Sequence, residues 1–390
     1  MPAGIASGTL HPATAADLAD ALGEAAAHLR SIQLCGRGSK QLMAGPIAPA
    51  DIAISTNALN RVIAYEPNDL TISVEAGMSW SELTALLASN RQMIPLDPPF
   101  SSAATAGGIV ASNCNGPRRR LYGTARDFVI GMTFATLEGK LVETGGMVVK
   151  NVAGLDVGKL MIGSFGTLAA IASVNFKLAP MPEAERGFLL SFADAASAIA
   201  ARNRILQSSL QPVAIDLLNL AAGATLGKRS FLLAIRVAGN AAAVERYERE
   251  FAPMGDGVAL EGEPHETLWT HIREFTPVYL SGHPSGAVVR ASCTLKGVEA
   301  EMASFEGPAI ARAASGVCYG YFEDVSAAMA WRRAAEGRGS KAVIEFAPET
   351  SKPTLELWPA PAGDFEIMRR VKNLFDPSNL LNRGRLYGRI

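Results

Sequence analysis

The sequence has few cysteines, and they are scattered. Cys35, Cys114, Cys293 and Cys318 share neither a CxxC spacing nor any other close spacing. Iron–sulfur and structural zinc sites need cysteines grouped in this way, so the sequence encodes neither, and a disulfide framework is not expected. This pattern indicates a reducing environment.

An excess of either charge is also lacking. The chain has 36 lysines and arginines against 37 aspartates and glutamates, a formal net charge of −1. Proteins that bind nucleic acid or anionic membranes usually carry a basic excess, so neither is expected as a direct partner. The N-terminus lacks the basic start and apolar core of a secretory signal, and no apolar run is long enough to span a bilayer. We therefore expect a soluble, cytoplasmic protein.

Length and local patterns predict two different halves. A chain of 390 residues with 48% hydrophobic residues predicts two or three domains, with a break near Pro180-Met-Pro182. Capping boxes at Thr14-Ala-Ala-Asp17 and Ser79-Trp-Ser-Glu82 predict helix starts in an α+β first half.

Strands are predicted from short apolar runs, and helices from the stretches between them. The predicted strands of the first half are residues 32–35, 52–55 and 70–74, followed by a hairpin of 128–137 and 141–144. Those of the second half are 187–192, 213–218, 231–237, 287–291, 317–322 and 342–346, and the helices are 193–207, 241–251, 327–336 and 364–374. This alternation predicts one sheet with helices on a single face.

A glycine-rich, almost charge-free track from Pro95 to Leu168 is the strongest functional signal. It contains Ala104-Thr-Ala-Gly-Gly-Ile-Val-Ala-Ser-Asn-Cys-Asn-Gly116, Lys150-Asn-Val-Ala-Gly-Leu-Asp156 and Ile162-Gly-Ser-Phe-Gly-Thr-Leu168. Glycines allow positive φ angles and close approach of a ligand to backbone N–H groups, so the track suits an anion held by main chain.

Two familiar nucleotide motifs do not fit. Gly36-Arg-Gly-Ser-Lys-Gln41 lacks the third glycine of a dinucleotide fingerprint, and Gly223-Ala-Thr-Leu-Gly227-Lys-Arg-Ser230 has one residue too few for a phosphate-binding loop and Arg in the place of its hydroxyl. The Gly36 loop and the later track could instead bracket a pyrophosphate. The alternative is that each glycine only makes a tight turn.

Several motifs, in order, resemble the FAD-binding domain of vanillyl-alcohol-oxidase-type (PCMH-type) flavoproteins over roughly residues 14–180. They are Arg37-Gly38, Leu59-Asn-Arg-Val-Ile63, Val74-Glu-Ala-Gly77, Thr105-Ala-Gly-Gly108, Tyr122-Gly-Thr-Ala-Arg-Asp127, Gly145-Gly-Met-Val-Val-Lys150 and Gly163-Ser-Phe-Gly-Thr-Leu168. Leu374-Phe-Asp-Pro377, Leu381-Asn382 and Gly384-Arg385 resemble the C-terminus of the same superfamily. Within it the chain is most similar to the smaller FAD-binding subunits of bacterial glycolate oxidases.

The resemblance implies an α+β fold: a PCMH-type FAD-binding domain of two α/β subdomains (1–182), a ferredoxin-like cap domain (183–363) and a C-terminal helix and tail (364–390) that return to the FAD domain. It also implies FAD contacts. Along the pyrophosphate these are Gly36, Arg37, Gly38, Ser39, Lys40, Gln41, Thr105, Ala106, Gly107, Gly108, Ser112 and Asn113. The others are Pro98 and Pro99 beside the flavin, Gly163, Thr167, Leu168 and Ile171 near the adenine or ribityl parts, and Asn382.

Two departures from the family limit the chemistry that the resemblance implies. Many members attach the flavin to a histidine of the first loop, which here reads Gly38-Ser39-Lys40, so FAD is expected to be non-covalent. Catalytic 2-hydroxy-acid dehydrogenases of this type carry a metal-ligating His-x-Gly-Asp-Gly-Asn-x-His stretch. The corresponding stretch, Ala313 to Tyr321, contains neither His nor Asp, so no catalytic residue and no metal ligand is identified.

The resemblance therefore implies an FAD-binding subunit of a multi-subunit enzyme that oxidises glycolate to glyoxylate. Its expected partners are a larger FAD-binding catalytic subunit, an iron–sulfur subunit and a small 2-hydroxy acid, with membrane association at most peripheral. Two alternatives are a free-standing 2-hydroxy-acid oxidoreductase and a flavin-bearing scaffold. His265, His271 and the run Arg118-Arg119-Arg120 are expected to be solvated or capping residues, with a metal or carboxylate site as the less favoured reading.

Overall fold

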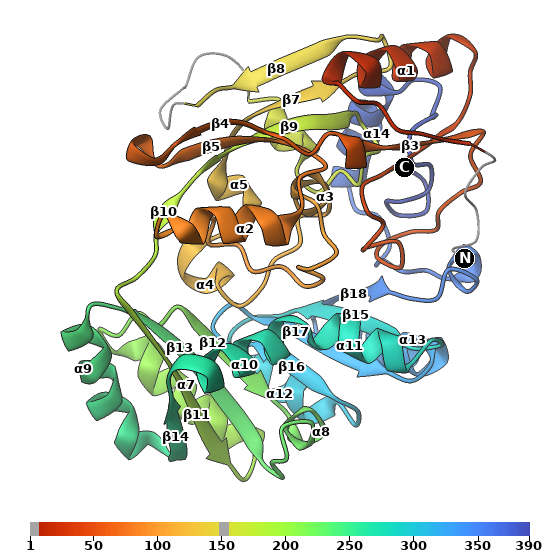
Figure 1. Ribbon diagram of the computed structural model, residues 1–390. Helices are drawn as coiled ribbons and strands as arrows, with labels where there is room; N and C mark the ends of the chain where they lie inside the picture. The colour runs from red at the N-terminus through yellow and green to blue at the C-terminus, as the bar shows by residue number, and fades with distance from the viewer. Residues whose placement is uncertain (1–7, 148–155) are drawn as a thin grey trace.

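The chain forms two halves, one above the other in Figure 1. This computed structural model describes residues 8–147 and 156–390. The first half, up to residue 182, contains a three-stranded sheet (β1-β3-β2), a five-stranded sheet (β4-β5-β9-β7-β8) and the pair β10-β6. The second half, residues 183–363, contains one eight-stranded sheet in the order β14-β11-β13-β12-β16-β17-β15-β18.

The first half alternates short strands with short helices. Its strands are β1 (Thr9–Leu10), β2 (Ile32–Cys35), β3 (Ile52–Ser55), β4 (Val62–Glu66), β5 (Thr71–Glu75), β6 (Gln92–Met93), β7 (Val129–Ala135), β8 (Leu141–Gly145), β9 (Ala170–Lys177) and β10 (Ala179–Pro180). Its helices are α1 (Ala15–Ala27), α2 (Trp80–Ser89), α3 (Ala106–Ser112), α4 (Arg119–Tyr122), α5 (Ala125–Phe128) and α6 (Gly158–Met161). The predicted strands near residues 32, 52 and 71 and the hairpin β7–β8 are confirmed.

The second half is built around its long antiparallel sheet. Its strands are β11 (Ala184–Phe192), β12 (Ala214–Leu218), β13 (Phe231–Gly239), β14 (Asp256–Leu260), β15 (Ala287–Ser292), β16 (Ala309–Arg312), β17 (Val317–Phe322) and β18 (Lys341–Phe346). Its helices are α7 (Ala195–Gln207), α8 (Leu220–Ala224), α9 (Ala241–Phe251), α10 (Gly262–Arg273), α11 (Phe275–Gly282), α12 (Val298–Ser304) and α13 (Val325–Gly337), and α14 (Asp364–Phe375) follows.

Local capping explains where α1 begins, but not α2. The Asp17 N–H donates to Thr14 Oγ1 (3.1 Å) and the Thr14 N–H to Asp17 Oδ2 (2.9 Å), which confirms the first capping box. Ser79 is the N-cap of α2, yet its hydroxyl caps no backbone group. It accepts from Arg37 Nη1 (3.2 Å) and lies 3.0 Å from Ser81 Oγ. The second capping box was therefore wrong, because a side chain from the Gly36 loop engages the cap.

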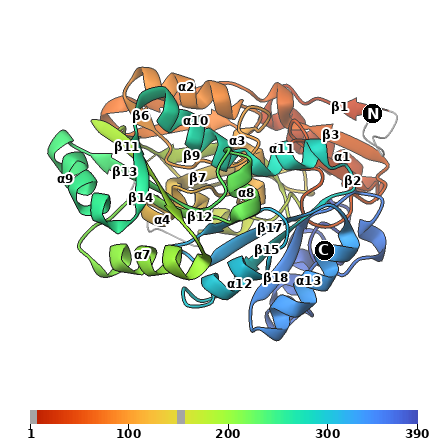
Figure 2. The same cartoon turned by 90° about the horizontal axis from the view of Figure 1, so that it is seen from below.

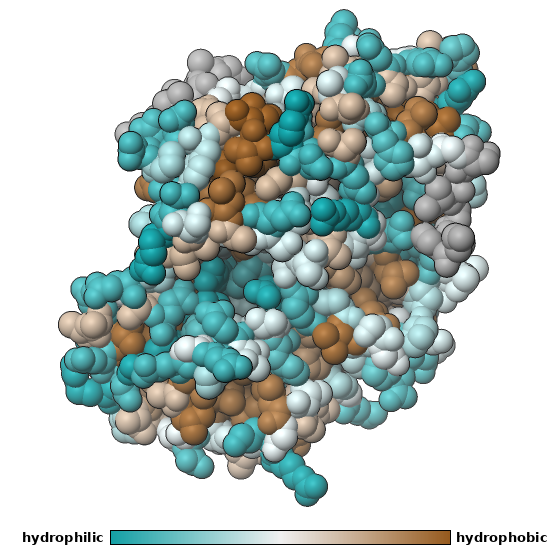
Figure 3. Space-filling view, viewed as in Figure 1, coloured by the Kyte–Doolittle hydropathy of each residue, from teal (hydrophilic) through white to brown (hydrophobic). Residues whose placement is uncertain are grey.

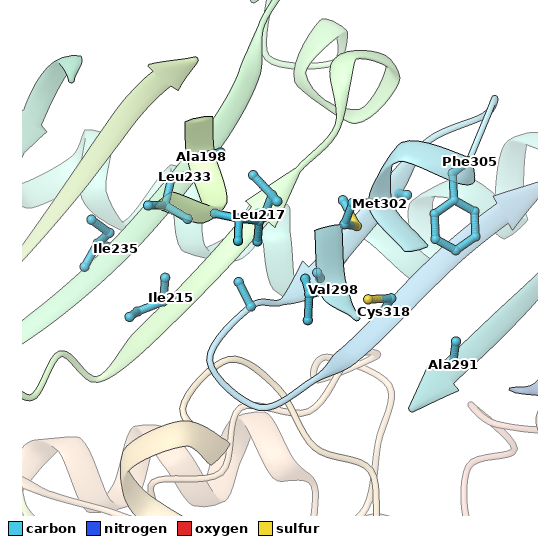
Figure 4. Packing of buried hydrophobic residues seen from close by; sticks show 14 of the residues in the cluster. Ala198, Ile215, Leu217, Leu233, Ile235, Ala291, Val298, Met302, Phe305 and Cys318 are labelled. Carbon is cyan, nitrogen blue, oxygen red and sulfur yellow. The ribbon is translucent and has the colours of Figure 1, made fainter. Parts of the chain in front are cut away.

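Helices cover both faces of the long sheet, so the prediction of a single covered face was wrong. Helices α7, α9, α12 and α13 pack on one face against side chains such as Ile215, Leu217 and Leu233 (Figure 4). Helices α10 and α11 pack on the other face, where Trp269 contacts the sheet. In Figure 2, α10 and α11 lie above strands β15 and β17, and α12 and α13 lie below them.

The second face of the sheet also meets the first half of the chain. The Ala44 N–H donates to the carbonyl of Glu345 (2.9 Å), and the Ala347 N–H donates to the carbonyl of Leu42 (3.2 Å). Arg118 forms an ion pair with Glu185 (3.4 Å), and Arg120 Nη1 donates to the carbonyl of Pro212 (2.7 Å). Only Arg119 of this run is exposed, so a wholly solvated arginine loop was wrong.

The C-terminal residues return to the first half, among its red and orange elements in Figure 1. Leu381 pairs in parallel with Ile32 of β2. Asp376 is fully buried and accepts from the N–H groups of Leu380 and Leu381, both at 2.8 Å, and from Lys372 Nζ. Lys372 Nζ also donates to the carbonyl of Thr167 (2.8 Å). A buried ion pair thus fixes the start of the tail, residues 376–390.

The face of the molecule in Figure 3 mixes apolar and polar residues. Figure 3 shows apolar residues in small, separate patches between polar ones on the face in view. No helix among residues 8–147 and 156–390 is long and apolar enough to cross a membrane.

Replacing Asp376 with Ala should destabilise the protein strongly. The change leaves the buried ammonium of Lys372 without its counter-ion, and breaking a buried pair in this way costs about 3–5 kcal/mol. The free energy of unfolding in urea measures the loss. Asp364→Ala, at the exposed start of the same helix, is the control and should cost about 1 kcal/mol or less. A loss in Asp376→Ala no larger than in the control would contradict the role given to this pair.

Candidate functional site

Four segments that are far apart in sequence enclose a first cavity. Its volume is about 160 Å³. Its walls come from the loop after β2 (Gly36–Gln41, hereafter the glycine loop), helix α3, Phe165-Gly166 and tail residues Asn382 to Arg385. All four segments belong to the motifs that predicted an FAD site.

The glycine loop presents backbone donors. Gly38 has φ +72°, a left-handed conformation that favours glycine. The N–H groups of Arg37, Gly38, Ser39 and Lys40 donate no hydrogen bond to any acceptor of the described residues. Successive free N–H groups in such a loop form an anion-binding concavity. The loop therefore fits the diphosphate of a dinucleotide such as FAD.

Glycines also bring the walls of this cavity together. A Cβ on Gly36 would lie 2.6 Å from Thr105 Oγ1, and one on Gly107 would lie 2.7 Å from the Cβ of Ala76. Gly166 has φ +70°, and its Cβ would meet Asn382 Nδ2 at 2.8 Å. These three positions need glycine for packing of the walls. Gly108 differs, because its Cβ would approach only Thr105 Oγ1, at 3.0 Å.

Two buried cations from later in the chain hold the end of the glycine loop. Arg385 Nη1 donates to the carbonyls of Gln41 (3.2 Å) and Gly45 (2.7 Å), and its Nη2 donates to that of Lys40 (3.3 Å). Lys352 Nζ donates to the Gln41 carbonyl (3.2 Å) and pairs with Glu349 (2.9 Å). Burial lowers the pKa of Arg385 to about 10 and that of Lys352 to about 8.

Asn382 connects three walls of the first cavity. Its Oδ1 accepts from the Leu34 N–H (2.7 Å), and its Nδ2 donates to the carbonyls of Phe165 (2.6 Å) and Leu34 (3.3 Å). The residue has φ +39°, which asparagine tolerates better than most side chains. Its amide therefore serves the backbone around the site, although the residue lines the cavity.

A second cavity adjoins the first, and Ser112 and Phe165 line both. Its volume is about 270 Å³, and it lies between the first half and the long sheet. Four arginines line it: Arg119, Arg273, Arg290 and Arg312. The cavity is therefore suited to an anionic ligand.

Carboxylates balance three of these arginines. Arg290 Nε donates to Glu345 Oε1 (3.1 Å), Arg273 Nε donates to Glu274 Oε1 (3.0 Å), and Arg312 pairs with the buried Asp216. Burial raises the pKa of Glu345, against the opposing effect of Arg290 and Arg312, and raises the pKa of Asp216 to about 6. Burial also raises the pKa of Tyr319, which faces the same cavity, to about 12.

The structure brings most of the predicted cofactor residues to these two cavities. The first is lined by Gly36, Arg37, Gly38, Ser39, Lys40, Gln41, Thr105, Gly107, Gly108, Ser112, Ile171 and Asn382. The second is lined by Pro99, Asn113 and Gly163, with Ser112 shared. Four predicted residues are buried in the walls and line neither cavity: Pro98, Ala106, Thr167 and Leu168. The motif segments 148–150 and 150–155 lie outside the described residues.

His265 and His271 contact polar side chains of the second half. His265 is buried with Nε2 3.3 Å from Glu185 Oε2, so a solvated His265 was wrong. Glu185, His265 and Glu266 are spaced as metal ligands could be, but Arg236 already pairs with Glu185 and lies 4.0 Å from Glu266. A cation there would displace or face a guanidinium. His271 Nε2 instead lies 2.9 Å from Thr225 Oγ1.

The sequence patterns did not identify Arg290, Arg312 and Glu345 as site residues, because the family motif expected in this half consists of histidine and aspartate. A signal was present in the strands themselves. Each residue is a charged side chain in a strand whose neighbouring residues are apolar: Arg290 in Val288-Val-Arg-Ala291, Arg312 at the end of Ala309-Ile-Ala-Arg312, and Glu345 in Val343-Ile-Glu-Phe346. A charge inside an apolar strand must be paired or face a polar site, so these positions marked the cavity.

A bulky side chain at position 108 should expel the cofactor without unfolding the chain. A Cβ at Gly108 would press only on Thr105 Oγ1, at 3.0 Å, so a small shift of that side chain accommodates it, and the rest of a leucine would enter the first cavity. We expect Gly108→Leu to be purified with at most a tenth of the wild-type flavin absorbance per chain and a near-normal apo-protein melting temperature. Gly337→Leu, with open space around its Cβ, is the control. Full flavin occupancy in Gly108→Leu would show that the cofactor lies elsewhere.

Comparison with known proteins finds matches for two segments of the chain that supply residues to the first cavity. Residues 6–145 match the family model described as "FAD binding domain", and residues 359–386 match "FAD linked oxidases, C-terminal domain". Glycolate oxidase subunit GlcE of Escherichia coli is 35% identical over 182 residues, 46% of this chain and 50% of the relative. Yeast mitochondrial D-lactate dehydrogenase [cytochrome] 1 is 32% identical over 161 residues, 41% of this chain and 27% of the relative. The chain thus spans at most half the length of these curated relatives.

Solved structures extend the similarity of fold to nearly the whole chain. 4-Ethylphenol oxidase from Gulosibacter chungangensis superposes with a TM-score of 0.75 at 14% identity, over 98% of this chain and 89% of the other. An alkyldihydroxyacetonephosphate synthase gives 0.73 at 16% identity, over 96% and 75%. The matched segment 6–145 contains the glycine loop and α3, which line the first cavity. Residues 6–145 are thus matched as an FAD-binding domain and residues 359–386 as the C-terminal part of an FAD-linked oxidase, and FAD is the cofactor of this chain.

Proposed function

We propose that this chain is the FAD-carrying subunit of a multi-subunit enzyme that oxidises glycolate to glyoxylate and passes the electrons to a partner subunit. The proposed partners are a larger FAD-binding catalytic subunit and an iron–sulfur subunit, in the cytoplasm and with membrane association at most peripheral. Similarity to the glycolate oxidase subunit GlcE supports the substrate and the subunit role.

The observation that carries the substrate class is the arginine-lined second cavity beside the FAD site. Arg273, Arg290 and Arg312 come from α10, β15 and β16, so three separate elements direct guanidinium groups at one space. Guanidinium groups bind carboxylates through paired hydrogen bonds, each contributing about 1.5–3 kcal/mol when charged. A small 2-hydroxy acid, with its single carboxylate, fits this chemistry.

For the alternative of a free-standing 2-hydroxy-acid oxidoreductase, Glu345 is the proposed proton acceptor. It is the one carboxylate among the described residues that line the second cavity. Bound FAD would supply the acceptor for the two electrons that leave the alcohol carbon with its hydrogen. Glu345 would take the hydroxyl proton, and Arg290 would keep the carboxylate ionised for that step, since their ion pair favours the charged form.

The same residues support a domain assignment. We propose residues 1–182 as the FAD-binding domain and 183–363 as the cap that supplies the second cavity. Residues 364–390 would then be a C-terminal segment that belongs with the FAD-binding domain, since Asn382 and Arg385 contact the glycine loop and its neighbours.

Anaerobic addition of glycolate to the purified chain separates the proposal from its two alternatives. If the chain carries electrons for a partner, the flavin absorbance near its visible maximum should bleach only after the partner subunits are added. Bleaching of the isolated chain would identify a free-standing 2-hydroxy-acid oxidoreductase. A flavin that stays oxidised in the turning-over complex would identify a scaffold and would contradict both redox roles.

Acid precipitation should release the flavin into the supernatant. The histidine that many relatives use to attach flavin has no counterpart in the glycine loop, and no histidine lines either cavity in the described residues. Flavin absorbance in the supernatant, measured against total flavin before precipitation, gives the released fraction, which should be near one. Flavin that remains with the precipitated chain would contradict non-covalent binding.

A further inference from the structure

Lys40 is a cation without a matching counter-ion, at the wall between the two cavities. It lines the first cavity, and its Nζ lies 5.8 Å from the centre of the Phe100 ring. Phe100 in turn stacks on Phe346, which lines the second cavity, at a ring-centre distance of 5.7 Å. The side chain thus leads from the glycine loop towards the second cavity.

The polar contacts of Lys40 are weak. Its Nζ has one hydrogen bond, to Ser39 Oγ at 3.4 Å, and no carboxylate oxygen of the described residues lies within 4.0 Å. Burial lowers the pKa of Lys40, and Glu274 opposes that shift only from a distance. Burying a cation costs free energy unless a negative group lies close to it. The environment of Lys40 therefore favours the binding of an anionic group next to its ammonium.

Glu274 is not free to be that partner. Its carboxylate accepts from the N–H groups of Phe100 (2.8 Å) and Ser101 (3.2 Å), from Ser101 Oγ (2.6 Å) and from Arg273 Nε (3.0 Å). These four donors hold the carboxylate at the start of the Phe100 turn. Lys40 therefore has no carboxylate partner among the described residues.

We propose that Lys40 stabilises the negative charge that the isoalloxazine ring gains on reduction, and so raises the reduction potential of the bound FAD. FAD carries negative charge in two places, its diphosphate and, when reduced, its ring. The four N–H groups of the glycine loop that donate to no described acceptor suit the diphosphate, whereas the Lys40 ammonium lies 5.8 Å from the centre of the Phe100 ring. Charge near the ring is one of the means by which a protein tunes a flavin.

This inference rests on the assignment of FAD to the two cavities, and it does not depend on glycolate as the substrate. Reduction potentials are measured by equilibration with a reference dye, so the test is independent of catalytic activity. The flavin need only be bound, which excess free FAD ensures. A chain that fails to oxidise glycolate would leave the measurement valid.

Lys40→Met should lower the two-electron reduction potential of the bound FAD. A tenfold loss in the preference for reduced over oxidised FAD corresponds to a fall of about 30 mV, and we expect at least that. Lys40→Arg keeps the charge and should retain most of the potential. Glu274→Gln removes the negative neighbour while keeping a planar acceptor, and should shift the potential upward.

Lys177→Met is the matched control. Lys177 lies over the Phe128 ring at 5.2 Å, so the change removes the same kind of lysine–phenylalanine contact at a site that lines neither cavity. Its potential should equal that of the wild type.

Two results would overturn the proposal. The first is a reduction potential of Lys40→Met equal to that of the wild type, measured with FAD bound. If this variant also binds FAD more weakly than the wild type, Lys40 instead contacts the diphosphate. The other is an unchanged or lower potential in Glu274→Gln, which decides the question even if Lys40→Met does not retain FAD or fold.

Discussion

The site depends on how the last residues of the chain hold the glycine loop. A loop with four unpaired N–H groups has little of its own to fix its shape, because its donors are kept for a ligand. Arg385 and Lys352 bind its carbonyl side instead, and Asn382 bonds to Leu34 in the strand that precedes it. The acceptor side of the loop is therefore satisfied by the protein, and the donor side is left for the cofactor.

Charge is concentrated where the two halves meet. The face of the long sheet towards the first half carries one charged residue on each of six strands: Glu185, Arg236, Asp216, Arg312, Arg290 and Glu345. Most of these charges are paired with one another, so the interface costs less than the number of buried ions suggests. The second cavity opens beside this row, where four arginines and one glutamate line it among the described residues.

Much of this could be predicted from the sequence, and the failures have physical causes. The glycines predicted the first cavity because a positive φ or a missing Cβ is a property of single residues, as at Gly38 and Gly107. The short strands β2 and β3 were predicted well because apolar runs bounded by turns are local signals. The second cavity was not predicted, since Arg290, Arg312 and Glu345 meet only through sheet pairing. The burial of Arg118 and His265 likewise depends on Glu185, a residue distant in sequence from both.

The bonds of Asn382 have a consequence for the order in which the protein is made. They join the tail to Leu34, 348 residues earlier, and to Phe165, 217 residues earlier. During synthesis the FAD-binding half emerges first, and the wall that Asn382 and Arg385 supply emerges only after the long sheet has been made. Contacts of such long sequence separation are slow to form. The first half alone therefore cannot complete the flavin site, and cofactor uptake becomes a step that follows synthesis of both halves.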